Sequence, residues 1–435
     1  ETSFLEKLVL VFRDTDTFCM YSDFNNSSQD IVYEEKVPAW SPIRFESVDY
    51  IGSVLAFDLE VFTRSNIGAE VNRNTVIDFA QANDLRFSRV PSVLYKCKPD
   101  FKRKKTLADN PPVPESVSVV IPTQGLSVAH DSLLEKCVKG LVKQVGVVSI
   151  ELIVIADAGY DHGVVSRVKE MLPKNFTFKL IEFNEPFNFS RKCNLGASQA
   201  IGQVVVFLND DVELLSPDGI SQLSRWSLVE GVGAVGSQLQ FPDGSIQHAG
   251  ITLREVKPRN SYLDQFPRVT DLGDLEVPHE VTGVTGACLA ITRDKFDSSG
   301  GWNEELPNSY NDVDLCLRLN NMGFQSVVLN QLKIIHNESS SRDARFDSRA
   351  FQTLKTLWPD ELGGERYLRS AEANGKYSGP WGSNRDDRLD LSGDFFSYSW
   401  HLISSVGIRK LIVAVLGRLT GKTSRLLSVT QSDYL

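Results

Sequence analysis

Two adjacent carboxylates follow a short apolar run in the segment GQVVVFLNDDVELLSPDG, residues 202–219. The apolar run at 204–208, between turn signals, predicts a fully buried strand with Asp210 and Asp211 at its carboxyl end. Neighbouring carboxylates repel each other and lose hydration, so a fold tolerates them mainly where water, a cation or N–H donors compensate. Because ligands bind at the carboxyl ends of strands in α/β sheets, the segment indicates a ligand site. The alternative is a helix N-cap followed by a solvated acidic turn.

The elements that must position these carboxylates alternate between strand-like and helix-like segments. Apolar runs predict strands at 117–121, 150–155, 176–181 and 204–208. Helix-like stretches lie between them, around 131–144, 163–172 and 189–201. A strand about every 30 residues with a helix between is typical of βαβ units on a parallel sheet.

Beyond Asp211 the pattern changes. Short strands are expected within 231–253 and 283–294, and an amphipathic helix over 311–323 precedes a strand that runs to His336. The predicted fold class is therefore α/β, with one doubly wound half and one half of mixed sheet.

The chain lacks the common sequence motifs that bind nucleotide phosphates. The first strand runs into IPTQGLSVAH, without the G-x-G-x-x-G of a dinucleotide fold, and no G-x-x-x-x-G-K-[ST] occurs. A sugar nucleotidyltransferase is disfavoured as well, because the glycine-rich basic loop expected after its first strand is missing. A divalent cation held by a carboxylate would neutralise a diphosphate instead.

Several segments together resemble the family 2 glycosyltransferases of GT-A fold, of the bacterial O-antigen type often called rhamnosyltransferase-like. They are SVSVVIPTQG, ELIVIADAG, FNFSRKCNLGASQAIGQVVVFLNDDVEL, VTGACLAITRDKFDSSGGWNEEL, YNDVDLCLRLNNMGFQSVV and IIHNESSSR, within residues 117–345. The resemblance implies a GT-A fold, which has a Rossmann-like nucleotide-binding half and a mixed-sheet acceptor half. It also implies a nucleoside-diphosphate sugar as donor.

The resemblance assigns nucleotide-binding roles to four residues of the first half. Thr123 and Asp157, at the first two strand ends, match positions that hold the nucleoside, although Asp157 could be a turn residue before Gly159. Arg191 and Asn194, at the start of a helix, match a segment that lines the nucleotide. A helix N-terminus with a guanidinium nearby suits a diphosphate.

The resemblance places NDD on the D-x-D motif of the family. Asp211 is then the expected metal ligand for Mg²⁺ or Mn²⁺, with Asp210 on the ribose or behind the ligand. Asn209 stands where the family has its first acidic residue, so direct ligation by this side chain is not implied. His336 matches a histidine that completes the metal or phosphate site in many such enzymes, and its alternative is a structural histidine.

Asp312 in YNDVDL matches the aspartate that serves these enzymes as general base for the acceptor hydroxyl. Asn311 replaces the preceding acidic residue, at a position on the acceptor side. Trp302 in SGGWNEEL is expected to form an apolar wall under a sugar ring, or else to be a core aromatic. Asp312 and Asp314 could also be first-turn residues favoured by the helix dipole.

Four regions are expected along the chain. Residues 1–97 resemble the closing half of a further GT-A-like unit, partial or degenerate, and 98–116 form a linker rich in Lys and Pro. Residues 117–345 form the catalytic domain, and 346–435 form a helical C-terminal extension. In its segment 399–427 a basic amphipathic helix could lie on an anionic membrane surface or pack on protein.

Composition narrows the class of protein. A net charge of −10 argues against general nucleic-acid binding, which needs clustered Lys and Arg. The chain shows no signal-peptide pattern and no apolar run near 18 residues. Its six cysteines, scattered without a C-x-x-C pair, are expected to be reduced core thiols, which indicates a cytoplasmic protein, here at the inner face of the plasma membrane.

The sequence therefore predicts an inverting, metal-dependent glycosyltransferase that uses a nucleotide sugar and a glycan or lipid-linked glycan acceptor in cell-surface polysaccharide synthesis. The alternative is a non-catalytic glycan- or nucleotide-binding relative, which Asn209 and Asn311 favour. Retention of Asp211, Asp312 and His336 favours the enzyme.

Overall fold

The structure is a computed structural model. It describes residues 17–28, 31–35, 40–47, 51, 55–58, 61–62, 73–97, 111–124, 132–254, 257–260, 277–337 and 347–363. The expected basic helix at 399–427 lies outside the described residues. Among the described residues, no helix combines the length and apolar character needed to cross a membrane.

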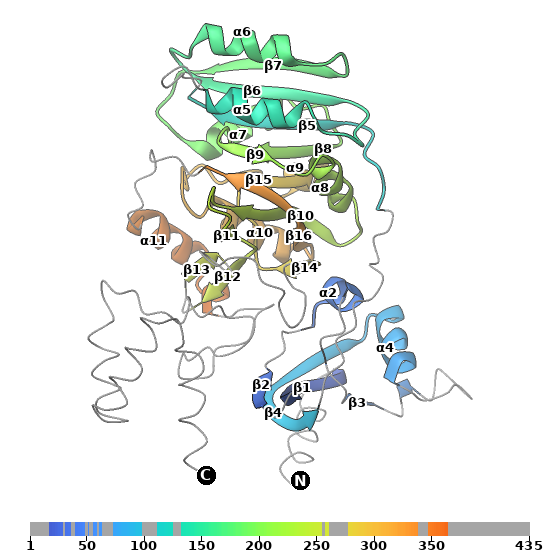
Figure 1. Cartoon of the computed structure of the whole chain (residues 1–435). Helices are drawn as coiled ribbons and strands as arrows, with labels where there is room; N and C mark the ends of the chain where they lie inside the picture. The colour runs from blue at the N-terminus through green and yellow to red at the C-terminus, as the bar shows by residue number, and fades with distance from the viewer. Residues whose placement is uncertain are drawn as a thin grey trace.

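A ten-stranded mixed sheet forms the centre of the larger unit (Figure 1). Its path runs β14 (Pro278–Val281), β16 (Gln325–His336), β10 (Val232–Gln240), β15 (Cys288–Thr292), β8 (Val204–Leu208), β5 (Val117–Thr123), β6 (Ile150–Asp157) and β7 (Phe176–Phe183). Off this path, β11 (Ile246–His248) pairs with β10 and β9 (Val212–Leu214) pairs with β16. Strands β8, β5, β6 and β7 are mutually parallel, which confirms the βαβ half. The other strands mix directions, as expected for the second half.

Helices cover both faces of the sheet. One face packs against α5 (Leu133–Leu141), α6 (His162–Met171) and α8 (Gly219–Ser227). The other packs against α7 (Phe189–Ser198), α9 (Arg293–Ser298) and α10 (Asn311–Asn321). Helix α7 lies so close to β5 that a Cβ at Gly196 would come within 2.4 Å of the Val120 side chain. Glycine is therefore required there for the helix to dock.

The larger unit extends past its expected end at residue 345. Helix α11 (Ser348–Leu357) and the 3₁₀ turn η2 (Glu361–Gly363) cover the outer side of α10. Leu354 and Trp358 pack there against Val313 and Leu317 of α10, together with Ile251 and Leu253 of β12 (Ile251–Arg254), which pairs with β13 (Lys257–Asn260). Because α10 presents apolar side chains on both sides, the start of the expected C-terminal extension covers its outer side.

The described residues of the N-terminal unit form a small sheet and two helices. Strand β1 (Thr17–Ser28) pairs antiparallel with β2 (Ile31–Glu35) and β3 (Ala56–Phe57), and parallel with β4 (Arg86–Cys97). Helices α2 (Pro42–Ser47) and α4 (Arg73–Ala82) complete the unit, whose core includes Phe18, Phe45, Phe62, Val76 and Ile77.

The strand pairing of this unit matches that of the closing half of the larger unit. Strand β10 also has two antiparallel partners, β11 and β15, and one parallel partner, β16. In each case a helix precedes the parallel strand, and a residue with positive φ follows that helix, Asp84 at 50° and Gly323 at 90°. The interpretation of residues 1–97 as a partial GT-A-like unit stays a prediction, with which this correspondence is consistent.

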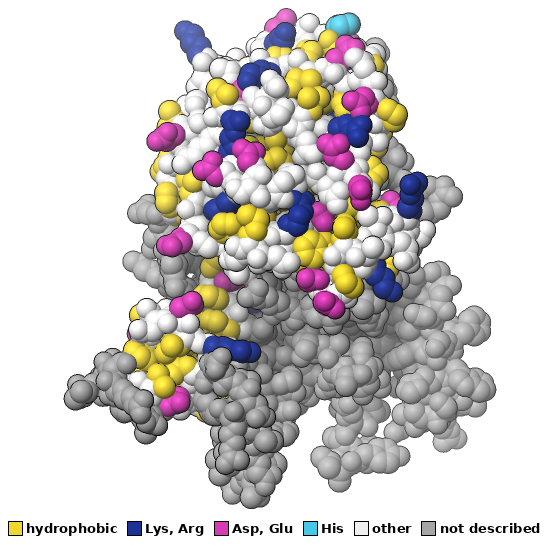
Figure 2. Space-filling view, turned by 180° about the vertical axis from the view of Figure 1, so that it is seen from behind, with side chains coloured by type: hydrophobic (Ala, Val, Ile, Leu, Met, Phe, Trp, Pro, Cys, Tyr) yellow, Lys and Arg dark blue, Asp and Glu magenta, His cyan; other side chains and the backbone are white. Residues whose placement is uncertain are grey.

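The surface shows no separation of charge by sign on the face drawn in Figure 2. Among the described residues of that face, Lys and Arg side chains lie interspersed with Asp and Glu. Such a mixed surface lacks the basic stripe that a nucleic acid would follow.

Candidate functional site

The carboxyl ends of β5 and β8 bring two of the predicted residues into contact. The Thr123 hydroxyl at the end of β5 donates to Oδ2 of Asp210 at 2.5 Å. Asp210 lies in the short connection from β8 to β9. The parallel pairing of β5 and β8 sets both side chains at the same edge of the sheet, as expected from sequence.

Asp210 is poorly accommodated as a charge. Burial raises the pKa of its carboxyl to about 6, and the neighbouring charge of Asp211 raises it as well. The Thr123 hydroxyl and the Lys192 ammonium oppose this rise. An ionised Asp210 therefore gains from any cation that approaches this edge of the sheet.

Asp211 and His336 face each other across the pairing of β9 with β16. Oδ1 of Asp211 lies 3.0 Å from Nε2 of His336. The other ring nitrogen, Nδ1, donates to Oε1 of Gln247 at 2.5 Å. That bond leaves Nε2 with its lone pair, toward which Asn209 Nδ2 points at 3.3 Å.

This pair fits a divalent cation. The buried Oδ1 atom of Asp211 faces Nε2 of His336, which is an acceptor when the neutral ring carries its proton on Nδ1. Among the described residues, no set of three His, Cys, Asp or Glu side chains comes together, so this chain would supply two ligands. Mg²⁺ and Mn²⁺ suit such a site, because they keep water and phosphate oxygens as their other ligands.

A buried lysine that the sequence analysis did not single out lies at the ends of β5 and β6. Lys192, on α7, is 1% exposed, and its Nζ lies 2.5 Å from Oδ1 of Asp157 and 2.9 Å from the carbonyl oxygen of Thr123. Its spacing from Phe189 and Cys193 places it on the buried side of α7. That helical position, read together with the two strand ends, was the signal that could have identified it.

Arg191 and Asn194 hold a loop in this structure. Arg191 forms ion pairs with Glu185 and, at 2.8 Å, with Glu304. The Asn194 side chain exchanges two hydrogen bonds, each 2.9 Å long, with the backbone of Trp302. Both side chains thus fix the segment 302–304, and their predicted contact with the nucleotide stays a prediction.

Two consecutive residues join the acidic segment to Asp312. The backbone N–H of Asn209 donates to the carbonyl oxygen of Ala287 at 2.9 Å. The N–H of Gly286 donates to Oδ2 of Asp312 at 3.1 Å. Segment 286–287 therefore holds the predicted general base and the predicted metal segment in one assembly, although they lie far apart in the sequence.

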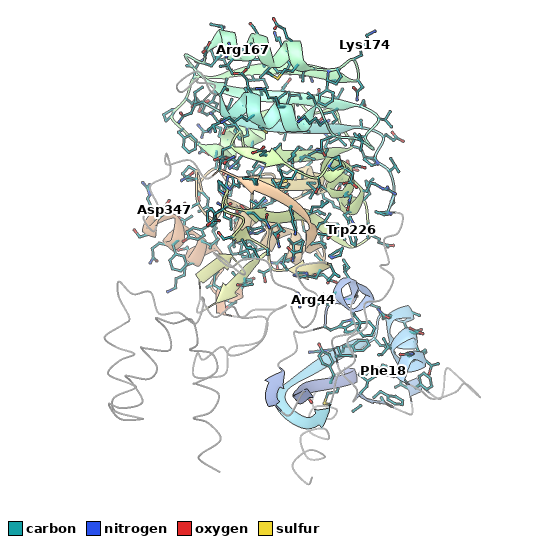
Figure 3. The ribbon with its side chains drawn as sticks, in the orientation of Figure 1. Phe18, Arg44, Arg167, Lys174, Trp226 and Asp347 are labelled. Atoms are coloured by element: carbon teal, nitrogen blue, oxygen red, sulfur yellow. The ribbon has the colours of Figure 1, made fainter. Side chains whose placement is uncertain are left out.

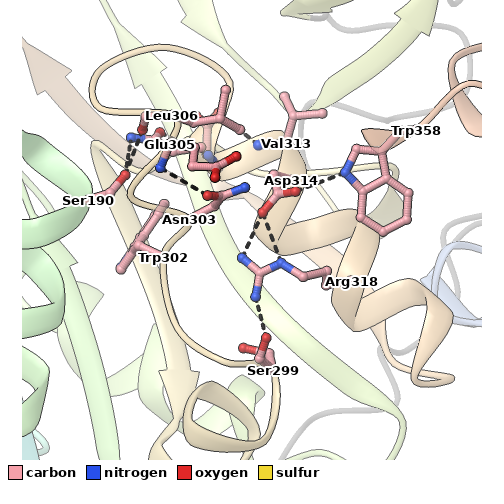
Figure 4. A network of polar contacts seen from close by, with 12 residues as sticks. Ser190, Ser299, Trp302, Asn303, Glu305, Leu306, Val313, Asp314, Arg318 and Trp358 are labelled. Carbon is pink, nitrogen blue, oxygen red and sulfur yellow. Dashed lines mark hydrogen bonds and ion pairs between the residues drawn. The ribbon is translucent and has the colours of Figure 1, made fainter. Parts of the chain in front are cut away.

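The two acids at the start of α10 have different surroundings. Asp314 is buried, pairs with Arg318 at 2.8 Å and accepts a hydrogen bond from Trp358 Nε1 at 2.9 Å, as Figure 4 shows. Asp312 accepts from Gly286 and, through Oδ1, from the N–H of Val313 at 2.8 Å. Asp314 is thus a structural acid that anchors α11, whereas Asp312 faces the segment next to the acidic cluster.

Trp302 and Asn311 are both buried. Trp302 is 1% exposed and packs edge to face against Phe189 and Phe207, as its core alternative describes, and its predicted place under a sugar remains untested. A Cβ at Gly286 would come within 3.0 Å of its indole, so Trp302 supports the segment that holds Asp312. Asn311 donates to the Ser190 hydroxyl at 3.1 Å, which ties α10 to α7, and its predicted place on the acceptor side remains untested.

Comparison with known proteins found matches to the larger unit. Residues 118–300 match the family described as Glycosyl transferase family 2. The chain is 32% identical over 229 residues to the uncharacterized protein y4gI of Sinorhizobium fredii, a match that covers 52% of this chain and 25% of that protein.

Two further relatives carry functional names. The O-antigen biosynthesis protein RfbC of Myxococcus xanthus is 34% identical over 204 residues, 44% of this chain and 16% of that protein. An N-acetylglucosaminyl-diphospho-decaprenol L-rhamnosyltransferase of Mycobacterium tuberculosis is 30% identical over 155 residues, 32% of this chain and 48% of that protein. The chain thus spans between about a sixth and about a half of the length of these relatives.

Among solved structures, the mannosyltransferase PcManGT from Pyrobaculum calidifontis, in complex with GDP-Man and Mn²⁺, has 15% identity and a TM-score of 0.47. The match covers 75% of this chain and 87% of that one.

Proposed function

Because residues 118–300 form a family 2 glycosyltransferase domain, we propose that the chain transfers a sugar, with inversion, from a nucleoside-diphosphate sugar to a glycan or lipid-linked glycan acceptor. The observation that carries the proposal is that segment 286–287 contacts both Asp312 and Asn209, through the Gly286 N–H and the Ala287 carbonyl oxygen. Asn209 lies two residues before Asp211, which faces His336, so the candidate base and the candidate cation ligands are proposed to serve one site.

The residues at the carboxyl ends of the strands are proposed to bind the donor. Asp157 is proposed to accept hydrogen bonds from the nucleoside, and Thr123 is proposed to donate one to it. Lys192 contacts both residues and so fixes their positions. Asp211 and His336 are proposed to hold Mg²⁺ or Mn²⁺. When bound, the cation would neutralise the diphosphate and so stabilise the leaving group.

On the acceptor side of the reaction, Asp312 is proposed to act as the general base. Inversion requires the acceptor oxygen to attack from the face opposite the diphosphate, while a base removes its proton. The Gly286 and Val313 amides each donate to one oxygen of Asp312, which fixes the orientation of the carboxylate. Each oxygen carries a second lone pair, so the carboxylate can still take a proton from a hydroxyl group.

The acceptor class is proposed from the relatives. One named relative acts in O-antigen biosynthesis, and another is named for transfer to a diphospho-decaprenol-linked sugar. A lipid-linked acceptor would place the enzyme in the cytoplasm at the inner face of the plasma membrane.

The non-catalytic alternative rests on Asn209 and Asn311, which replace acidic residues of the family pattern. In the structure each amide makes a defined contact, Asn209 with His336 and Asn311 with Ser190. These contacts give each asparagine a structural task that does not require the loss of activity.

A screen of nucleoside-diphosphate sugars tests the proposal. Purified chain would be incubated with each donor and Mn²⁺, and release of nucleoside diphosphate would be measured by chromatography. We expect slow, metal-dependent hydrolysis of one donor class, and none with EDTA or with Asp211→Ala. Nucleotide binding without turnover of any donor, with and without lipid-linked acceptors, would favour the non-catalytic alternative.

A further inference from the structure

Helix α2 of the N-terminal unit is shared between two hydrophobic cores. Phe45 is 3% exposed and belongs to the core of the N-terminal unit. Ile43, two residues earlier, packs against the core of the large sheet. Trp40, just before the helix, stacks on Phe87 of β4 with 3.8 Å between ring centroids. The helix therefore belongs structurally to both units, and Arg44 on it marks their junction in Figure 3.

A single carboxylate of the large sheet receives the start of α2. Glu280, on the edge strand β14, is 2% exposed. Its Oε1 accepts from the Ile43 N–H at 2.9 Å, and its Oε2 accepts from the Arg44 N–H at 3.4 Å and from the Ser41 hydroxyl. These are N–H groups at a helix start, which have no partner within the helix. Glu280 thus acts as the cap of a helix that belongs to the other unit.

The surroundings of Glu280 are as buried as the carboxylate itself. Ser41 and Arg44 are at most 1% exposed. Burial lowers the pKa of the neighbouring His279 well below its usual value, and the charge of Arg44 lowers it further, so His279 is neutral near pH 7. A buried carboxylate that loses its hydrogen-bond donors is costly, which makes this contact specific for a docked N-terminal unit.

Strand β14 leads directly to the segment that holds Asp312. Glu280 pairs with Val327 on β16, and six residues further along the chain the Gly286 N–H donates to Asp312. Between them, Gly283 accepts from the Ile251 N–H at 2.7 Å, and the Thr285 N–H donates to Nε2 of His248 at 3.4 Å. Asn320 Nδ2 and Cys316 Sγ of α10 also contact this segment, at the Thr282 carbonyl oxygen and the Val284 N–H. The segment thus connects β14 directly to the helix that carries Asp312.

We propose that Glu280 is a positioning residue, which docks the N-terminal unit on β14 and thereby sets segment 282–287 and the carboxylate of Asp312. The catalytic consequence rests on the proposed function of Asp312, whereas the docking does not. The N-terminal unit is on this view a structural partner of the acceptor half.

Glu280→Gln tests the proposal, since glutamine keeps the volume but offers one accepting oxygen in place of two. We expect backbone amides of α2, and the Gly286 amide, to exchange with deuterium at least ~10-fold faster than in the unchanged protein. Transfer kcat should fall by roughly 10-fold because Asp312 is less well placed, while the donor KM stays unchanged. Glu280→Ala should show larger effects of the same kind.

Glu151→Gln is the matched control. Glu151 is also a buried carboxylate of the sheet, 5% exposed, and accepts from the Ser118 hydroxyl and from the Ile201 N–H at 2.9 Å. It lies on β6, which five strands of the sheet separate from β14, so its variant should leave exchange at α2 and Gly286 unchanged.

The outcomes separate docking from function. Unchanged exchange at α2 in Glu280→Gln would overturn the docking role, and faster exchange at α2 with unchanged exchange at Gly286 would overturn the positioning role. If the unchanged protein transfers no sugar, the proposed function fails, but the exchange at Gly286 still decides the positioning of Asp312. Equal transfer kcat in both proteins, despite faster exchange at Gly286, would also contradict the proposal.

Discussion

Nε2 of His336 lies 3.0 Å from Oδ1 of Asp211, and in the neutral ring with its proton on Nδ1 both atoms are hydrogen-bond acceptors. The antiparallel pairing of β9 with β16 produces this contact, because His336 pairs with Val212, the residue that follows Asp211. Two acceptors at this distance repel each other unless a proton or a cation lies between them. The backbone therefore builds a site that needs a positive charge.

Asp210→Asn should stabilise the metal-free protein near pH 7. The pKa of Asp210 is raised to about 6 in the folded protein, above its unfolded value, so folding becomes less favourable as the pH rises from about 4 to 6. Removing the charge should raise the free energy of unfolding by about 2 kcal/mol above pH 7. Urea denaturation at pH 4 and pH 7.5, with EDTA present, measures the difference between variant and unchanged protein.

The difference between the two proteins should be small at pH 4 and large at pH 7.5. An equal difference at both pH values would show that Asp210 is not strained by its charge.

Lys192→Met should destabilise the fold and weaken nucleotide binding. Lys192 is buried against Asp157 and the Thr123 carbonyl, so its loss leaves a carboxylate of the site without its partner. We expect a loss of about 1–3 kcal/mol in the free energy of unfolding. Thermal and urea denaturation measure the loss, and calorimetry measures nucleotide binding.

Lys179→Met is the control for Lys192. Lys179 pairs with Glu151 at 2.7 Å, but its side chain is 40% exposed, so its loss should cost less than about 1 kcal/mol. Equal costs for the two variants would mean that Lys192 is an ordinary surface ion pair.

Asp312→Asn should separate binding from transfer. Asparagine keeps the size of the side chain and an accepting oxygen for Gly286, so donor binding should persist. Transfer should fall by roughly 10²–10⁴-fold, as is typical when a general base is lost. Transfer rates within a few-fold of those of the unchanged protein would make Asp312 a helix-start residue only.

Asp314→Asn is the comparison for Asp312. Because Asp314 anchors Arg318 and Trp358 inside the fold, its variant should lower stability first. A fall in transfer without loss of stability would show that Asp314, and not Asp312, acts as the base.

The segment 399–427, which lies outside the described residues, should bind anionic vesicles. Leu402, Val406, Leu411, Val415 and Leu419 recur at helical spacing, and five Lys or Arg residues accompany them in an otherwise acidic chain. Flotation with vesicles that contain phosphatidylglycerol measures binding of the full chain and of a chain that ends at Ser392. Equal flotation of both would exclude a membrane role for this segment.

The order of the elements and the place of the acidic pair could be predicted from the sequence. The length of the apolar run alone identifies β8 as a buried strand. Because the carboxyl end of a buried parallel strand is exposed to ligands, the position of Asp210 and Asp211 at a ligand site could also be predicted. The apolar face of α10 likewise predicts its helix, and Gly323 ends it with φ of 90°.

The contacts that give each residue its task could not be predicted, because they join distant parts of the chain. Asp312 and Asp314 are equivalent as helix-start acids in the sequence. What distinguishes them is Trp358, the residue after α11, whose indole N–H donates to Asp314. Trp302 follows two glycines, which suggests an open loop, yet the loop folds inward and buries the indole beside Phe207. Gln247, which orients His336, carries no motif at all.

Calorimetric titration of the full chain with nucleoside diphosphates, in Mn²⁺ and in EDTA, tests the proposed site most directly. We predict binding in Mn²⁺ that is lost in EDTA, in Asp211→Ala and in His336→Ala, while all three proteins unfold cooperatively. Equal affinity for the nucleotide with Mn²⁺ and with EDTA would contradict the proposed cation site of Asp211 and His336.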